Sequence, residues 1–342
     1  MWNHQALPSQ RRSGCSRGNS AVSSALLLLL ALQVGCGDGS SPRPIFSKLY
    51  VANAHGNSIT VYLASDTGNT APIATITGPG TGLSSPTGLM LGPDGRLYVS
   101  NSGNHSITIY EAEADGDASP VDTIFGDSTK LDNPVDLAFD LEHRLYVANY
   151  LGQRITIYSP LAHGDATPIA SIEGPTSGLS GPSGIALDAT GKIYVTNADN
   201  YSVTIYAPGG TFSTPVATIK GDLTGLNIPN GLALSSTRQI YVANLAPGAS
   251  SITVYAVGDT GNVAPVSTIS GDSTGLSQPH LLVFDADGRL YASNIFFNSI
   301  TVFKAGDHDN AVPVAIIAGS NTKLNYPSGM TITGPARGTV IP

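Results

Sequence analysis

Two residues depart from a recurring segment in a way that could support chemistry. The segment has the pattern Pro-x-Gly and begins at Pro86, Pro134, Pro182, Pro229, Pro279 and Pro327. Asp136 replaces the Gly of the second copy, and His280 lies beside Leu281, which replaces the Gly of the fifth. A carboxylate and an imidazole can transfer protons or hold a divalent metal, so Asp136 and His280 are candidates for an acid–base or metal site. Simple decay of the repeat would explain both departures equally well.

A second set of candidates lies in six short segments whose sequences vary from copy to copy. These segments are AHGN (54–57), SGNH (102–105), YLGQR (150–154), ADNY (198–201), LAPGAS (245–250) and IFFN (295–298). The side chains they offer to a ligand are His55, His105, Tyr150, Arg154, Asp199, Tyr201, Phe296 and Phe297. Phe296 and Phe297 are the strongest candidates, because two adjacent exposed aromatic side chains reduce solubility unless a partner covers them. The alternative is that these loops vary because nothing constrains them.

Asparagine ends a similar run in every copy, which raises the question of a metal or carbohydrate site. The residues are Asn53, Asn101, Asn149, Asn197, Asn244 and Asn294. A structural role is favoured, since a ligand rarely needs six equal contacts and Asn at a strand end can hydrogen-bond the following turn. Turns such as GDTGN (258–262) and GDHDN (306–310) carry oxygen donors for Ca²⁺ but lack the dense spacing of a calcium loop, so solvated turns are favoured there.

The elements that must position these residues repeat with a period of about 48. Tyr50 recurs as Tyr98, Tyr146, Tyr194, Tyr241 and Tyr291. In the unit 86–131, four short runs have the alternation or β-branched content of strands: 88–91, 96–101, 106–110 and 120–126. The Asp94-Gly95 pair between the first two predicts a tight hairpin turn, because Gly accepts a positive φ. A period of 40–50 residues with four strands is typical of a β-propeller blade.

The unit PSGIALDATGKIYVTNADN (182–200) resembles the NHL repeat, which places P-x-G-apolar-A-apolar-D before G-x-apolar-Y-V. The resemblance covers residues 47–334 and implies an all-β fold, a β-propeller of four-stranded antiparallel blades. The first copy begins at its second strand, and the last, PSGMTIT (327–333), has only a first strand. We therefore expect six blades, with the C-terminal strand closing the ring beside 49–53, which removes two open sheet edges.

The first residues have the layout of an export signal. Arg11, Arg12 and Arg17 precede an apolar stretch that ends in Gly35-Cys36. This resembles a bacterial lipoprotein signal, which implies cleavage after 1–35 and lipidation of Cys36. The alternative is a plain secretory signal that leaves a free thiol. Residues 36–46 are expected to form a flexible tether and 335–342 a C-terminal tail, which would place the propeller on the cell envelope, on the periplasmic or surface side of the outer membrane.

Composition narrows the classes of function. The net charge is −8 with 16 Lys and Arg, so no basic surface is predicted for nucleic acid. We expect a monomeric binding module that recognises a ligand or envelope protein through its variable loops and needs no cofactor. The alternative is a metal-dependent enzyme, similar to gluconolactonases or streptogramin lyases, with a divalent metal at the channel mouth. Glutamate is scarce (Glu111, Glu113, Glu142 and Glu173), which disfavours the lactonase alternative. A surface spacer without a specific ligand is a third hypothesis.

Overall fold

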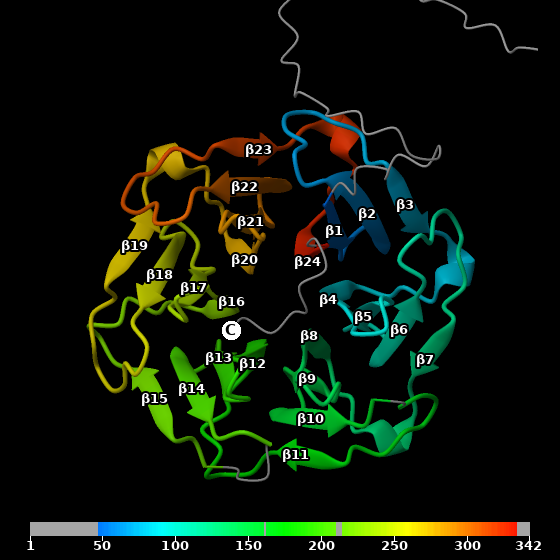
Figure 1. The fold of residues 1–342 in the computed structure, drawn as a ribbon, viewed down its shortest axis with the longest axis horizontal. Coiled ribbons are helices and arrows are strands. Elements are labelled where there is room, and N and C mark those ends of the chain that lie inside the picture. The colour runs from blue at the N-terminus through cyan, green and yellow to red at the C-terminus, as the bar shows by residue number, and fades with distance from the viewer. Residues whose placement is uncertain (1–46, 161, 210–213, 334–342) are drawn as a thin grey trace, which may run out of the picture. The chain divides into compact units, whose positions relative to one another are not determined.

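The computed structural model describes residues 47–160, 162–209 and 214–333, and these ranges form six four-stranded antiparallel sheets. The sheets surround a central axis as the blades of a propeller (Figure 1). The predicted all-β, six-bladed fold is therefore confirmed. Cys36 and the segments 1–35 and 335–342 lie outside the described residues. Among the residues that are described, no helix has the length and apolar character needed to cross a membrane.

Each blade runs from an inner strand beside the axis to an outer strand at the rim. Blade one holds β24 (Pro327–Ile332), β1 (Lys48–Asn53), β2 (Ser58–Leu63) and β3 (Ala74–Thr77). Blade two holds β4 (Pro86–Leu91), β5 (Leu97–Asn101), β6 (Ser106–Tyr110) and β7 (Asp122–Ile124). Blade three holds β8 (Pro134–Phe139), β9 (Leu145–Asn149), β10 (Arg154–Tyr158) and β11 (Ala170–Ile172).

The second half of the ring repeats this order. Blade four holds β12 (Pro182–Leu187), β13 (Ile193–Asn197), β14 (Ser202–Tyr206) and β15 (Ala217–Lys220). Blade five holds β16 (Pro229–Leu234), β17 (Ile240–Asn244), β18 (Ser251–Tyr255) and β19 (Ser267–Ser270). Blade six holds β20 (Pro279–Phe284), β21 (Leu290–Asn294), β22 (Ser299–Phe303) and β23 (Ala315–Ile317). Short 3₁₀ turns follow four outer strands: η1 (Pro79–Thr81), η2 (Asp127–Thr129), η3 (Asp272–Thr274) and η4 (Ser320–Thr322).

The hydrophobic core lies between neighbouring blades. One buried cluster, for example, joins Ile59 and Val61 of blade one to Leu97 and Val99 of blade two. Side chains alternate across each sheet, so the second and third strands are buried on both faces. Packing of blade on blade therefore stabilises the ring in the same way at each interface.

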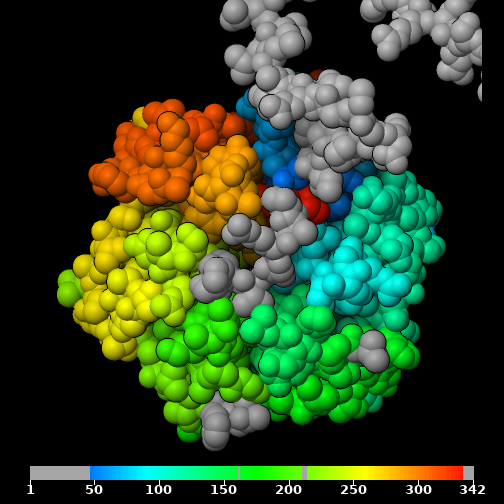
Figure 2. All heavy atoms as spheres, viewed as in Figure 1, coloured from blue at the N-terminus to red at the C-terminus, as the bar shows by residue number. Residues whose placement is uncertain are grey.

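Blade one is completed by the two ends of the propeller. β24 pairs antiparallel with β1, with Leu49 opposite Ile332 and Val51 opposite Met330. The pairing confirms the predicted closure of the ring, and the red of the C-terminal strand lies against the blue of the first strand (Figure 2). A closed ring leaves neither end blade with an exposed face.

The topology also fixes which loops share a face of the ring. Because strands alternate in direction, the loops between second and third strands lie on the same side as the connections from each outer strand to the next blade. In blade one, for example, Asn53 at the end of β1 pairs with Pro327 at the start of β24. The loop after the second strand and the connection before the first strand therefore lie on the same side. We call this side the mouth face. The loops between first and second strands, and between third and fourth strands, lie on the opposite face.

Candidate functional site

All the loop residues that the sequence marked as ligand contacts belong to the mouth face, but they form separate groups. Phe296 and Phe297 follow β21 in blade six and are 67% and 64% exposed. Their ring centroids are 5.4 Å apart, so the two side chains make one continuous apolar surface. Exposed aromatic side chains such as these are enriched at protein–protein interfaces.

A stacked aromatic pair lies at the next loop along the ring. The imidazole of His55, in blade one, stacks on the phenol ring of Tyr326 with centroids 4.1 Å apart. Tyr326 also meets His280 edge to face at 6.5 Å, and its N–H donates to Oδ1 of Asn298, the neighbour of Phe297. These contacts bring His55, Tyr326, His280, Phe296 and Phe297 to the junction of blades six and one. We call this group the aromatic junction.

Sequence reasoning missed Tyr326, the centre of the aromatic junction. It occupies the position before the recurring Pro, where the other copies have Ser85, Asn133, Gly181, Ile228 and Gln278. That position varies as much as the loops do, and this variation was the signal that could have identified Tyr326.

The hydrogen bonds made by this variable position explain several loop residues. Its N–H donates to a side chain of the preceding blade: to Asn57 Oδ1 from Ser85, His105 Nδ1 from Asn133, Gln153 Oε1 from Gly181, Ser250 Oγ from Gln278 and Asn298 Oδ1 from Tyr326. We call these bonds the mouth latches. The Nδ1 atom of His105 accepts the N–H of Asn133 at 3.2 Å and lies 3.4 Å from Oδ1 of Asp132. The structure thus gives His105 a role in joining blades two and three.

Tyr150 and Tyr201 belong to a second group on blades three and four. The hydroxyl of Tyr150 donates to Asp199 Oδ1 at 2.7 Å, and this bond is the main reason that the pKa of Tyr150 is raised to about 12. Tyr201 is 45% exposed and has a left-handed backbone, with φ 53°. Arg154 lies 3.6 Å from the carboxylate of Glu173, so its charge is directed away from these tyrosines toward the outer strand.

Asp136 lies on β8, at the position where most inner strands have Gly. At that position the backbones of neighbouring blades approach closely. A Cβ placed on Gly231 would lie 2.5 Å from the backbone oxygen of His280 in the next blade, which explains the recurring Gly. Asp136 is 5% exposed, and its carboxylate accepts the N–H groups of Leu137 and of Ile185 in blade four, both at 2.9 Å. Burial raises the pKa of Asp136 to about 7, and the two N–H groups oppose this shift.

His280 lies on β20, three blades away from Asp136. Its Nδ1 is 2.8 Å from the backbone oxygen of Ser328 in blade one. A carbonyl oxygen only accepts, so Nδ1 carries the proton and Nε2 has the free lone pair. Burial lowers the pKa of His280 to about 4, so the ring is neutral at pH 7. Each residue bonds the next blade, and no hydrogen bond or ion pair joins the two among the described residues.

The remaining inner-strand entries join blades in a similar way. Thr87, Ser183 and Ser328 each donate a hydroxyl to the backbone oxygen of a Pro in the next blade, at 3.1, 2.9 and 2.8 Å. Two entries differ: Val135 has no polar side chain, and the buried Oδ1 of Asn230 has no hydrogen-bond partner in the described part of the chain. Most of the channel ring is therefore engaged between blades.

The structural interpretation of the recurring Asn residues is confirmed, although the partners differ from the expected ones. Asn149 is fully buried, its Nδ2 donates to Thr156 Oγ1 at 3.0 Å, and its Oδ1 accepts the N–H of Asp132 at 3.0 Å. Asp132 belongs to the connection before the inner strand, so the amide ties that connection to the second strand instead of bonding the following turn. The other five copies make the equivalent bonds.

The turns that carry Asp and Asn near the rim also bond the neighbouring blade. In five of these turns, a side-chain oxygen accepts a backbone N–H from the segment that follows the outer strand of the preceding blade. The accepting residues are Asn69, Asp117, Asp165, Asn262 and Asn310. These oxygens are engaged, and the described residues contain no group of three His, Cys, Asp or Glu side chains that could hold a metal ion.

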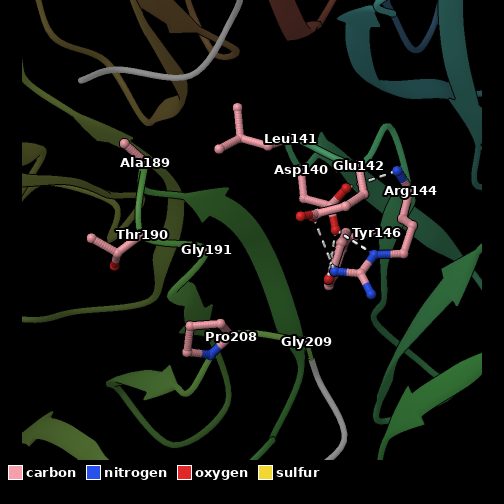
Figure 3. A pocket seen from close by; sticks show the side chains of 10 residues that line it. All are labelled: Asp140, Leu141, Glu142, Arg144, Tyr146, Ala189, Thr190, Gly191, Pro208 and Gly209. Carbon is pink, nitrogen blue, oxygen red and sulfur yellow. Dashed lines mark hydrogen bonds and ion pairs between the residues drawn. The ribbon is translucent and has the colours of Figure 1, made fainter.

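A pocket of about 240 Å³ lies on the opposite face, between the first-to-second turns of blades three and four (Figure 3). Asp140 lies in its wall and accepts hydrogen bonds from Arg144 Nε at 2.6 Å and from the Tyr146 hydroxyl at 3.0 Å. Blade six repeats this arrangement with Asp285, Arg289 and Tyr291. The repetition indicates a structural role in the turn.

Comparison with known proteins places the chain among the propellers. The sequence model of the NHL repeat matches residues 83–110 and 179–206. No curated protein sequence matches the chain. The protein is thus a six-bladed β-propeller that contains NHL repeats.

Solved structures with this fold have different activities in their names. A chain of the nidogen–laminin complex has a TM-score of 0.60 at 17% identity, covering 84% of this chain and 98% of that one. A putative 6-phosphogluconolactonase from Bacteroides fragilis has a TM-score of 0.59 at 15% identity, with coverage of 86% and 99%. Virginiamycin B lyase from Staphylococcus aureus has a TM-score of 0.51 at 15% identity, with coverage of 75% and 78%. At these identities the similarity concerns the fold alone.

Proposed function

We propose that the protein is a binding module that captures its ligand on the mouth face, at the aromatic junction. The observation that carries this proposal is the pair Phe296 and Phe297, about two-thirds exposed, on a loop whose Asn298 accepts the N–H of Tyr326, the partner of His55 in the stacked pair. Aromatic side chains supply large contact area at low cost in conformational entropy, which favours binding. The neighbouring inner ring has few groups that can move protons, because most of its side chains bond the next blade.

The test uses a double substitution on the surface. Phe296→Ser with Phe297→Ser should abolish capture of the partner from a cell-envelope extract and leave the melting temperature unchanged. The matched control is Leu223→Ser, which removes a side chain of similar exposure, 63%, from the connection between blades four and five. Equal capture by the double variant and the wild type would contradict the proposal.

The enzyme alternative is supported by the shifted pKa values of Asp136 and His280. A carboxyl with a pKa of about 7 is suited to proton transfer near neutral pH, and a neutral imidazole with a free Nε2 lone pair can accept a hydrogen bond or bind a metal. If a lactonase or lyase activity is found and disappears with Asp136→Asn or His280→Ala, the enzyme hypothesis replaces the binding one. If an activity is found and both variants keep it, Asp136 and His280 have no role in it; if the wild type has no such activity, the enzyme hypothesis is contradicted.

We also propose that the propeller is exported and anchored to the envelope through a lipid on Cys36. Support comes from the apolar run that ends in Gly35-Cys36. Mass spectrometry of the mature N-terminus should detect acylated Cys36, and Cys36→Ser should release the protein from the membrane fraction. An unmodified Cys36, or a mature protein that begins elsewhere, would contradict the anchor.

A further inference from the structure

One blade interface lacks the mouth latch that the other five have. Between blades four and five, the latch position is Tyr201. Its side chain has no amide oxygen to accept a backbone N–H, as the side chains of Asn57 and Asn298 do. No described residue accepts the N–H of Ile228, which occupies the donor position of this interface. The missing bond leaves a main-chain donor at the mouth face.

The backbone at this interface is nevertheless held in the same conformation as at the others. Tyr201 has φ 53° and Ile228 has φ 50°. The left-handed region is unfavourable for aromatic and especially for β-branched residues, whereas Asn tolerates it. Strained conformations of this kind concentrate at sites that contact ligands. At the interface without a latch, the latch position thus holds Tyr201, which fits this backbone conformation less well than the Asn of two other latches.

The segment that begins blade five has a second polar atom without a partner, in a side chain of its inner strand. Asn230 follows Ile228 by two residues and is the inner-strand entry whose Oδ1 has no partner among the described residues. The corresponding hydroxyls of Thr87, Ser183 and Ser328 all bond the next blade. Residues 228–230 thus lack the latch and the side-chain bond that 85–87, 181–183 and 326–328 have, although their backbone oxygens accept hydrogen bonds from Leu245, Ser183 and Thr196.

We propose that Tyr201 and Ile228 form a subsite for an extended peptide of a partner protein. A main-chain carbonyl of the peptide accepts the Ile228 N–H, in place of the missing latch, and an apolar peptide side chain packs on the ring of Tyr201. The proposal rests on the binding function proposed above and adds a second contact region, on blades four and five. Sugars fit less well, because they need several polar side chains, and Asp199, the nearest charge in the loop, already accepts from Tyr150.

The probe is a library of short random peptides selected on the wild-type protein. Tyr201→Asn should weaken binding of the selected peptides by more than about tenfold, because the new amide oxygen takes the Ile228 N–H and the ring is lost. The same variant should melt at a higher temperature, since it completes the latch. Tyr201→Phe keeps the ring and adds no acceptor, so it should bind within about twofold of the wild type.

The matched control is Asn57→Ser, which retains an acceptor at the latch between blades one and two and should not affect peptide binding. Selection of no peptide, or equal binding by Tyr201→Asn and the wild type, would overturn the subsite. Preference for chito-oligosaccharides over peptides would also overturn it. If peptides lose affinity with the Phe296 and Phe297 double variant but not with Tyr201→Asn, the proposed function stands and this subsite does not.

Discussion

At the scale of single residues, Phe303 occupies a position that tyrosine holds in the other five blades. The hydroxyls of Tyr158 and Tyr255 donate to the backbone oxygens of Thr129 and Thr224, at 2.5 and 2.6 Å. Tyr62, Tyr110 and Tyr206 make the same bond with Thr322, Thr81 and Ser177. Each bond joins the third strand of a blade to the connection that precedes it, and in blade six this bond is missing.

Phe303→Tyr should therefore raise the free energy of unfolding by about 1 kcal/mol, because the hydroxyl can donate to the oxygen of Thr274. Tyr158→Phe should lower it by about 1–2 kcal/mol, since the buried oxygen of Thr129 loses its donor. Urea unfolding of both variants measures the two effects. A destabilising Phe303→Tyr would mean that blade six has no room for the hydroxyl.

His280 predicts a dependence of stability on pH. Its pKa is about 4 in the folded protein, because of burial, and about 6.5 when unfolded. Between these values the unfolded state binds more protons, so stability is fully present above pH 6.5 and falls as the pH decreases toward 4, by at most about 3 kcal/mol. The difference in unfolding free energy between wild type and His280→Gln should show this loss.

That comparison removes the effect of Asp136, which both proteins share. Its pKa is raised to about 7, so its contribution has the opposite sign and is lost as the pH rises from about 4 to about 7. A pH-independent difference between wild type and His280→Gln would contradict the lowered pKa of His280.

At the scale of the elements, each blade is a four-stranded sheet whose second strand ends in a buried Asn. This amide connects three segments of one repeat: the second strand, the third strand and the connection before the first strand. The connection has no strand partner of its own there. The Asn side chain thus supplies the hydrogen-bond acceptor that a backbone N–H of the connection needs.

Asn149→Ala should lower the free energy of unfolding by about 2–4 kcal/mol, because it leaves the N–H of Asp132 and the hydroxyl of Thr156 without their partner in a buried site. The control is Asn321→Ala, an exposed residue whose backbone N–H, and not its side chain, makes the hydrogen bond recorded for it, and this change should alter stability by less than about 0.5 kcal/mol. Chemical denaturation distinguishes the two. If both variants lose equally little stability, the recurring Asn does not stabilise the blade.

At the scale of the whole molecule, stability depends on closing the ring. β24 supplies the inner strand of blade one, and Met330 packs in a cluster with Leu49 and Val51 of β1 and with residues of blade six. Outer strands are also joined to the next blade: Gly116 of blade two donates to Thr75 of blade one at 2.9 Å and accepts from Thr77. Opening one interface therefore exposes core on two blades.

A protein that ends after Tyr326 should lose several kcal/mol of unfolding free energy, enough to threaten folding of a domain of ordinary marginal stability. The control ends after Thr333 and keeps all of β24, so it should melt like the full chain. Calorimetry of both proteins is the measurement. A truncated protein with an unchanged melting temperature would contradict closure by β24.

The fold could be predicted from the sequence because its information is local and occurs in six copies. Alternating apolar residues, the Asp94-Gly95 turn and the split first repeat specified strands, blade number and closure without any distant contact. The sequence alone also predicted that Phe296 and Phe297 are exposed in a loop, and the structure shows both side chains about two-thirds exposed.

The partners of the site residues were decided only by the tertiary structure. His105 bonds a residue 28 positions away, and Asp136 one that is 49 positions away, in each case on the next blade. Tyr326 became a candidate only because the structure shows its ring in contact with His55 of blade one and His280 of blade six. Such contacts depend on how blades approach one another, and the approach is set by packing of the whole ring, so no stretch of sequence contains it.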